Sequence, residues 1–251
     1  MLAWTIYLSF AGALACSLTP RANPRATRAV ALGTALLGFF CGLGGALQFK
    51  PVNGVEVITF AHWIPALGID YSLAADGISV TLVLLTGIAA VAGVLFSWNV
   101  EHRTNEFFAF FFALIGGVYG VFLSLDLFLL FVFYEIAIVP KYFLIAIWGS
   151  TRRDYAAMKL ALYSFIGSGM VLIGMLAAYA VSGAGTFDLQ TLAQQSYTPE
   201  FQRWAFPLVF VGFAILAGMW PFHTWAPTGH SAAPTAASML LAGVEIGRAH
   251  V

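Results

Sequence analysis

Residues 124–149 read SLDLFLLFVFYEIAIVPKYFLIAIWG, and this stretch decides the fold of the chain. It is apolar over more than the roughly 20 residues that a helix needs to cross a bilayer. It also lacks the alternation of apolar and polar residues that marks a strand of a membrane barrel. Lipid offers no partner to unpaired backbone groups, so a spanning segment of this kind must be a helix. The stretch therefore predicts a transmembrane helix.

The rest of the chain has the same character. Of its 251 residues, 61% are hydrophobic and 9% are charged, whereas a soluble domain has roughly 25% charged residues. We therefore predict an all-α fold, a polytopic transmembrane helical bundle. The first helix lacks the basic region that precedes the apolar core of a signal peptide, so we expect it to stay in the protein. The expected helices cover residues 2–18, 28–48, 78–99, 107–124, 126–148, 155–182 and 204–220, with an eighth beginning near 232.

The charges of the chain are informative by position. Eleven basic and eleven acidic residues balance to a net charge of +0, so no overall field attracts nucleic acid. Basic residues gather in the odd-numbered connections, at Arg21, Arg25, Arg28, Arg103, Arg152, Arg153 and Lys159. The positive-inside rule then places these connections in the cytoplasm and the N-terminus outside. The long second connection should lie at the outer interface, with Trp63 as an anchor there.

Glu135 is the most informative charge. It follows Asp126, which opens the fifth helix, by nine residues, and therefore lies roughly 13 Å along the helix, near the middle of a bilayer core about 30 Å thick. An ionisable group at that depth costs roughly 3 kcal/mol on insertion scales and should face a bundle interior or a wet cavity, where it usually serves function. The alternative is a structural hydrogen bond to a neighbouring helix.

Lys141 lies on the same expected helix, directly after Pro140. It is about 120° round the helix from Glu135 and roughly 9 Å further along it, so the two are not an ordinary ion pair of one helix face. Burial disfavours the charged form of a carboxylate and of an amine, which lets both exchange protons near neutral pH. Lys141 is thus a candidate for a proton relay. Alternatively, its long side chain extends to the cytoplasmic interface.

A second signal is the seventh apolar segment, in which glycines and prolines interrupt the apolar pattern and predict a broken helix. The interrupting residues are Gly218, Pro221, Pro227, Gly229 and Pro234. A broken helix at membrane depth is tolerated where protein or water satisfies the freed backbone, which is how many transporters build ion sites. His223 and His230 flank the break, and histidine exchanges protons readily near neutrality. Lys159 is either a basic cytoplasmic flank or a buried member of the same relay.

Four strings resemble the antiporter-like membrane subunits of respiratory complex I, the proton-translocating NADH:quinone oxidoreductase. They are LAADGISVTLVLLTG, the fifth-helix string quoted above, MKLALYSFIGS and PFHTWAPTGHSAAPTAASMLLAGV, and they lie between residues 73 and 244. The resemblance implies the first inverted-repeat half of such a bundle. It implies proton pumping driven by electron transfer elsewhere, with NADH, FMN, iron–sulfur clusters and quinone bound by partner subunits and no cofactor here. The implied partners are other membrane subunits, the lipid bilayer and protons.

The same resemblance assigns site residues. Glu135 matches the family's fifth-helix glutamate, Lys159 a sixth-helix lysine, and His223 and His230 the seventh-helix histidines. Together with Lys141 they form the expected proton relay. No residues show the spacing of a metal site. The expected location is a bacterial plasma membrane in preference to the mitochondrial inner membrane.

The chain departs from the family at two places. Leu216 occupies the position of a lysine that usually pairs with the fifth-helix glutamate, and our hypothesis is that Lys141 supplies the missing positive charge. At the end, residues 245–251 read EIGRAHV, where an apolar helix should continue. They can be back-translated into a common sequencing-adapter sequence, so we expect the native sequence to end at residue 244. The expected divisions are residues 1–72, 73–244 and 245–251.

Three other functions fit parts of the pattern. A subunit of a multicomponent sodium/proton antiporter, or of a membrane-bound hydrogenase, would share the same helices. A structural scaffold would need no charge inside the membrane, and Glu135, Lys141 and the broken helix argue against it.

Overall fold

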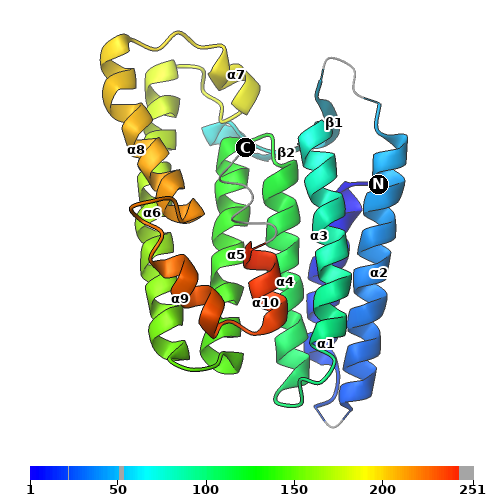
Figure 1. Ribbon diagram of the computed structural model, residues 1–251. Coiled ribbons are helices and arrows are strands. Elements are labelled where there is room, and N and C mark those ends of the chain that lie inside the picture. Colours follow the sequence, from blue (N-terminus) through cyan, green and yellow to red (C-terminus); the bar gives the residue numbers. More distant parts are fainter. Residues whose placement is uncertain (22, 51–53, 243–251) are drawn as a thin grey trace.

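The computed structural model describes residues 1–21, 23–50 and 54–242, and these form a bundle of helices standing side by side (Figure 1). The helices are α1 (Ala3–Leu18), α2 (Pro24–Gln48), α3 (Gly77–Phe96), α4 (Thr104–Leu123), α5 (Leu127–Trp148), α6 (Arg153–Ser182), α7 (Leu189–Ala193), α8 (Pro199–Ala217), α9 (Trp225–Ala232) and α10 (Thr235–Leu240). Among the described residues, six helices are long and apolar enough to cross a membrane, and α1 is a shorter apolar helix. The predicted fold class is confirmed.

The seventh predicted helix is displaced toward the N-terminus. Its counterpart α8 begins at Pro199, because the Thr198 hydroxyl accepts a hydrogen bond from the Phe201 N–H at 3.3 Å and proline fits the first helical turn. The helix ends at Ala217, because Gly218 adopts a φ of 68°, which terminates a helix at little cost only for glycine.

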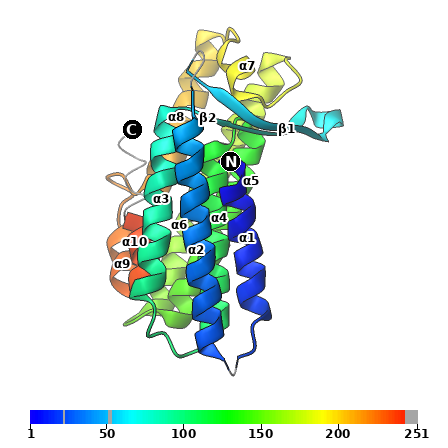
Figure 2. The same cartoon turned by 90° about the vertical axis from the view of Figure 1, so that its right-hand side faces the viewer.

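The second connection, predicted as a loop, forms a β-hairpin. Strand β1 (Glu56–Ile64) pairs antiparallel with β2 (Ile69–Ala75), in a register that joins Glu56 to Ala75. A short 3₁₀ turn, Pro65–Leu67, and Gly68 with a φ of 65° connect the strands. The hairpin extends across one end of the bundle (Figure 2). Trp63 lies on it and is 47% exposed, and its role as an interfacial anchor stays a prediction.

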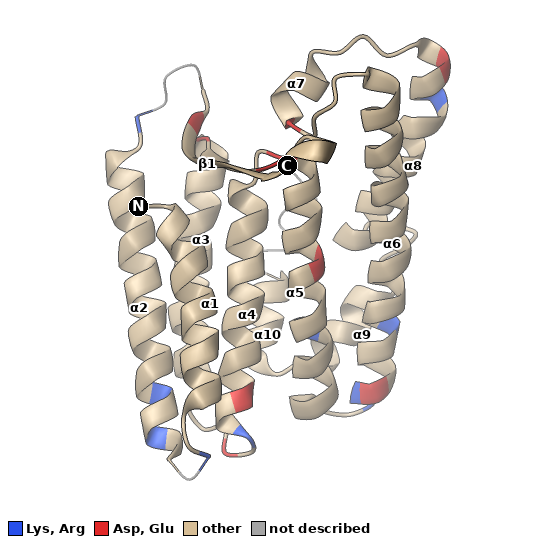
Figure 3. Ribbon diagram, turned by 180° about the vertical axis from the view of Figure 1, so that it is seen from behind, with Lys and Arg blue, Asp and Glu red and all other residues tan. Residues whose placement is uncertain are grey.

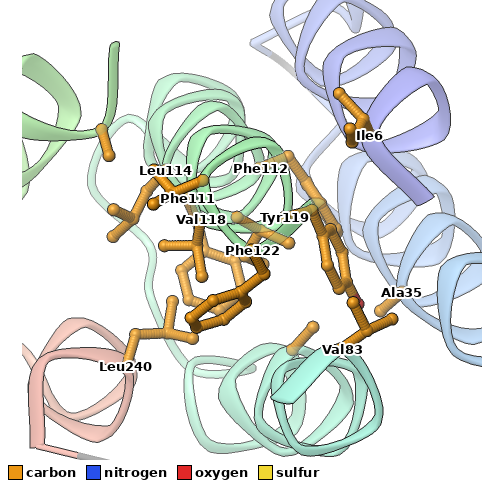
Figure 4. Packing of buried hydrophobic residues seen from close by; sticks show 14 of the residues in the cluster. Ile6, Ala35, Val83, Phe111, Phe112, Leu114, Val118, Tyr119, Phe122 and Leu240 are labelled. Atoms are coloured by element: carbon orange, nitrogen blue, oxygen red, sulfur yellow. The ribbon is translucent and has the colours of Figure 1, made fainter. Parts of the chain in front are cut away.

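The core is built around α4, on which α1, α3 and α5 pack. The close view in Figure 4 shows Phe111, Val118 and Tyr119 of α4 among side chains from α1, α2, α3 and α10. A Cβ atom at Gly120 would clash with the ring of Phe133 on α5. The absence of a side chain at Gly120 therefore allows α5, which carries Glu135, to approach the most buried helix.

Charged residues lie mainly at the two ends of the bundle, apart from bands of charge on α5 and α6 (Figure 3). Arg21 of the first connection pairs with Glu106 at the start of α4, at 2.7 Å, and Arg103 pairs with the same carboxylate. The first and third connections are thus tied together at one end. The division between residues 72 and 73 stays a prediction, and it falls within β2. The predicted change at residue 245 lies outside the described residues.

Candidate functional site

Helix α5 holds two of the five predicted relay residues. Its first turn is capped by Asp126, whose side chain accepts a hydrogen bond from the Leu129 N–H at 2.9 Å. Pro140 lies inside the helix and is buried, and it lacks the N–H that would bond the carbonyl of residue 136. The helix nevertheless continues to Trp148, so Glu135 and Lys141 are held on one continuous helix.

Glu135 is partly buried. Its Oε1 atom is inaccessible to solvent and has no hydrogen-bond donor in the described part of the chain. No ion pair involves Glu135 within that part either. A buried carboxylate oxygen without a donor is costly, so Glu135 is a candidate functional residue rather than one that stabilises the fold. The alternative of a structural hydrogen bond at Oε1 finds no support among these contacts.

Lys141 is 4% exposed. Its Nζ atom lies 5.5 Å from the centroid of the Tyr134 ring, a distance typical of a cation–π contact. Tyr134 is seven residues earlier, on nearly the same face of the helix. The amine thus turns back toward the middle of α5, which contradicts the alternative that Lys141 extends to the cytoplasmic interface.

The predicted break in the seventh segment is present. After α8 the chain leaves the helical conformation, turns and re-enters it in α9, which packs on α6, and then in α10, which packs on α3. The broken segment therefore crosses one face of the bundle (Figure 1). The indole Nε1 of Trp225 donates to the Ile215 carbonyl at 2.8 Å, which satisfies one backbone group near the end of α8. Sequence reasoning missed Trp225.

Lys159 lies beside this break. Its Nζ donates to the Thr224 carbonyl at 2.8 Å, and the Tyr163 hydroxyl shares a 2.9 Å hydrogen bond with the Thr224 hydroxyl. Of the two alternatives for Lys159, this contact favours membership of the site over a purely cytoplasmic flank. Tyr163 and Thr224 were not predicted as site residues.

The two histidines have different surroundings. His223 is exposed and directly precedes Thr224, the residue whose carbonyl accepts a hydrogen bond from Lys159. His230 is partly buried on α9, and its Nδ1 lies 3.3 Å from the Ser238 hydroxyl of α10. The structure thus places Lys159 in contact with Thr224, the residue after His223, and it places Glu135 and Lys141 on α5. The proton-relay role of all five residues stays a prediction.

Leu216 is packed against α6. A Cβ atom at Gly167 would lie 2.8 Å from the Leu216 Cγ atom, so this leucine fills the space over a glycine of α6. The position at which the family resemblance implies a lysine is therefore apolar and directed at α6. Among the described residues, no group of three or more His, Cys, Asp or Glu side chains could hold a metal ion.

An apolar helical bundle with one broken helix and charged side chains inside it is an architecture typical of polytopic membrane transport proteins. The chain belongs to the NADH:quinone oxidoreductase/Mrp antiporter transmembrane family, whose model matches residues 124–249, half of its length. The resemblance of the fifth-helix and broken-helix strings is thereby confirmed.

Relatives of this chain are named as chains or subunits of quinone oxidoreductases. The chain is 42% identical over 184 residues to NAD(P)H-quinone oxidoreductase chain 4 3 of Picosynechococcus sp., covering 73% of this chain and 34% of the relative. It is 36% identical to NADH-quinone oxidoreductase subunit M of Pseudomonas aeruginosa, covering 97% of this chain and 52% of the relative. The chain thus spans about half or less of the length of these relatives.

Solved structures share the fold. A chain of respiratory complex I from Thermus thermophilus superposes with a TM-score of 0.85 at 26% identity, covering 96% of this chain and 49% of that one. A chain of an archaeal membrane-bound sulfane sulfur reductase gives a TM-score of 0.81 at 23% identity, covering 96% and 51%, which shows the fold alone.

Proposed function

We propose that this chain forms part of a membrane subunit of NADH:quinone oxidoreductase that translocates protons, coupled to electron transfer from NADH to quinone in partner subunits. The observation that carries the proposal is Glu135, a carboxylate in the middle of α5 with a buried oxygen that no donor in the described residues satisfies. Family membership and the names of the relatives support the same activity.

The chain's own contribution is proton transfer. Glu135 and Lys141 of α5 and Lys159, His223 and His230 around the break supply groups that can gain and lose a proton. NADH, FMN, iron–sulfur clusters and quinone belong to partner subunits in this proposal, and the redox chemistry takes place there. The other membrane subunits, lipid and protons are the partners.

The proposed location is a bacterial plasma membrane with the N-terminus outside. The connections rich in arginine all lie at one end of the bundle, as Figure 3 illustrates, and the positive-inside rule places that end in the cytoplasm.

The test compares NADH-driven proton uptake by membrane vesicles that contain the full-length protein or its Glu135→Gln variant. We expect the variant to lose about 100-fold in the proton-transfer step, which is the lower range for a positioned acid–base group. Glu200→Gln, an exposed acid in the first turn of α8, is the matched control. Unimpaired pumping by Glu135→Gln would leave a scaffold role, and pumping driven by a sodium gradient without NADH would favour the antiporter.

A further inference from the structure

Thr224, where the break meets α9, is held from α6 by two side chains. The Lys159 amine donates to its carbonyl at 2.8 Å, and the Tyr163 hydroxyl bonds its hydroxyl at 2.9 Å. Lys159 and Tyr163 are four residues apart, so they lie one above the other on one face of α6. The Thr224 carbonyl also accepts a hydrogen bond from Thr228 at 3.0 Å.

The amine of Lys159 is further confined by aromatic rings. Its Nζ lies 5.8 Å from the centroid of the Tyr155 ring and 6.0 Å from that of Tyr163, both within the range of cation–π attraction. A surface cavity of about 480 Å³ opens at this place, lined by Tyr155, Met158, Lys159, Leu162, Tyr163 and Thr224. That volume is ample for water, so water could reach the amine that these contacts hold in position.

We propose that Tyr163 is a positioning residue of the proton relay, because its hydroxyl fixes the break between α8 and α9 in contact with the Lys159 amine. Proton transfer requires donor and acceptor within hydrogen-bond reach, and a misplacement of about 1 Å can cost about 100-fold in rate. Without the Tyr163–Thr224 bond, Lys159 would be the one side chain of α6, among the described residues, that still hydrogen-bonds to Thr224. The inference rests on the proposed function, since it concerns the relay in which Lys159 takes part.

The experiment uses the full-length protein in its membrane complex and measures protons pumped per NADH oxidised, which corrects for the amount of assembled complex. Tyr163→Phe and Thr224→Val each remove one side of the hydroxyl–hydroxyl bond and keep the ring or the carbonyl. We expect each to lower the ratio by about 2- to 10-fold, the effect of losing one net hydrogen bond. The double variant should be no worse than either single variant, because both remove the same bond.

Two further variants separate positioning from loss of folding. Thr224→Ser keeps the hydroxyl and should restore the ratio. Tyr179→Phe removes a hydroxyl from the far end of α6, where the ring stacks on Phe187 at 4.3 Å, and should leave the ratio unchanged. Hydrogen exchange of the backbone at residues 218–224 should be faster in Tyr163→Phe than in Tyr179→Phe.

The outcomes distinguish the role of Tyr163 from the proposed function of the chain. Equal pumping by Tyr163→Phe and Tyr179→Phe would overturn the role given to Tyr163, even if exchange at the break is faster. Additive losses in the double variant would overturn it as well. Absence of NADH-driven pumping in the unaltered protein would instead refute the proposed function, and the role of Tyr163 with it.

Discussion

The indole nitrogen of Trp225 donates a hydrogen bond of 2.8 Å to the backbone carbonyl of Ile215, in the interior of the bundle. This bond joins the first residue of α9 to the last turn of α8, across the residues between the two helices. Trp225 is 4% exposed, and the Ile215 carbonyl also accepts a hydrogen bond from the Gly218 N–H at 3.1 Å, so removing the indole donor costs one buried hydrogen bond. We expect Trp225→Phe to lower the free energy of unfolding by about 0.5–1.5 kcal/mol, measured by denaturation in detergent micelles.

The matched control is Trp204→Phe, which changes an exposed tryptophan on α8 (48% exposed). Its effect should stay within about 0.5 kcal/mol. Equal stability losses in the two variants would mean that the Trp225 bond contributes nothing specific to the break.

Lys141 yields a prediction that separates function from stability. Its amine is buried and lies over the Tyr134 ring. Methionine has a similar shape without charge, and replacing a buried charged group by a well-packed apolar one is often neutral or stabilising. We expect Lys141→Met to leave stability unchanged or higher and to impair NADH-driven pumping by about 100-fold, as removal of a relay group would.

The control for this variant is Lys50→Met, which removes an exposed lysine beyond the end of α2. Pumping by Lys141→Met at the rate of Lys50→Met would refute the hypothesis that Lys141 supplies the charge missing at Leu216.

The long helices were predictable because an apolar run of about 20 residues has one stable structure in lipid. The hairpin was missed, although it had a signal. Residues 57–60 are Val, Ile, Thr and Phe, which favour strands, and Pro65 and Gly68 mark the turn that follows. The early start of α8 also had a signal, in Thr198 followed by proline.

The site was predictable only in part. Glu135 and Lys141 are evident from sequence because charges stand out in an apolar helix. The contacts of Thr224 with Lys159 and Tyr163 join residues 65 and 61 positions apart, and no local pattern encodes such a separation. Trp225 likewise appears in the sequence as one more apolar residue, and its hydrogen bond depends on how the chain turns after Gly218.

A substitution at Gly120 tests how closely α5 packs against α4. A Cβ atom there would clash with the Phe133 ring, which is itself buried. Overpacking of this kind typically costs about 1–3 kcal/mol, so Gly120→Ala should lower the free energy of unfolding by that amount.

Gly33→Ala on α2 is the control, because a Cβ atom there meets nothing within 4 Å. It should be neutral or stabilising by up to about 1 kcal/mol through helix propensity. A stability of Gly120→Ala equal to that of Gly33→Ala would show that α4 and α5 can separate freely.

Asp126, just outside α5, is expected to make the free energy of unfolding depend on pH. It is 1% exposed, and burial raises the pKa of its carboxyl, although hydrogen bonds from the backbone N–H groups of Leu129 and Asp70 oppose the change. The folded state therefore holds this proton more tightly than the unfolded chain, whose aspartate pKa is about 3.9. The stabilising contribution of the group is complete below that value and is lost as pH rises through the folded pKa.

Asp126→Asn cannot ionise, but asparagine still caps a helix. We expect the advantage of the unaltered protein over this variant in free energy of unfolding to shrink as pH rises from about 4 toward neutrality. Asp126→Ala removes the cap at every pH and should cost about 1 kcal/mol more than the asparagine variant. Denaturation in micelles across this pH range measures both differences. A constant difference between Asp126→Asn and the unaltered protein would show that the carboxyl titrates alike in the folded and unfolded states.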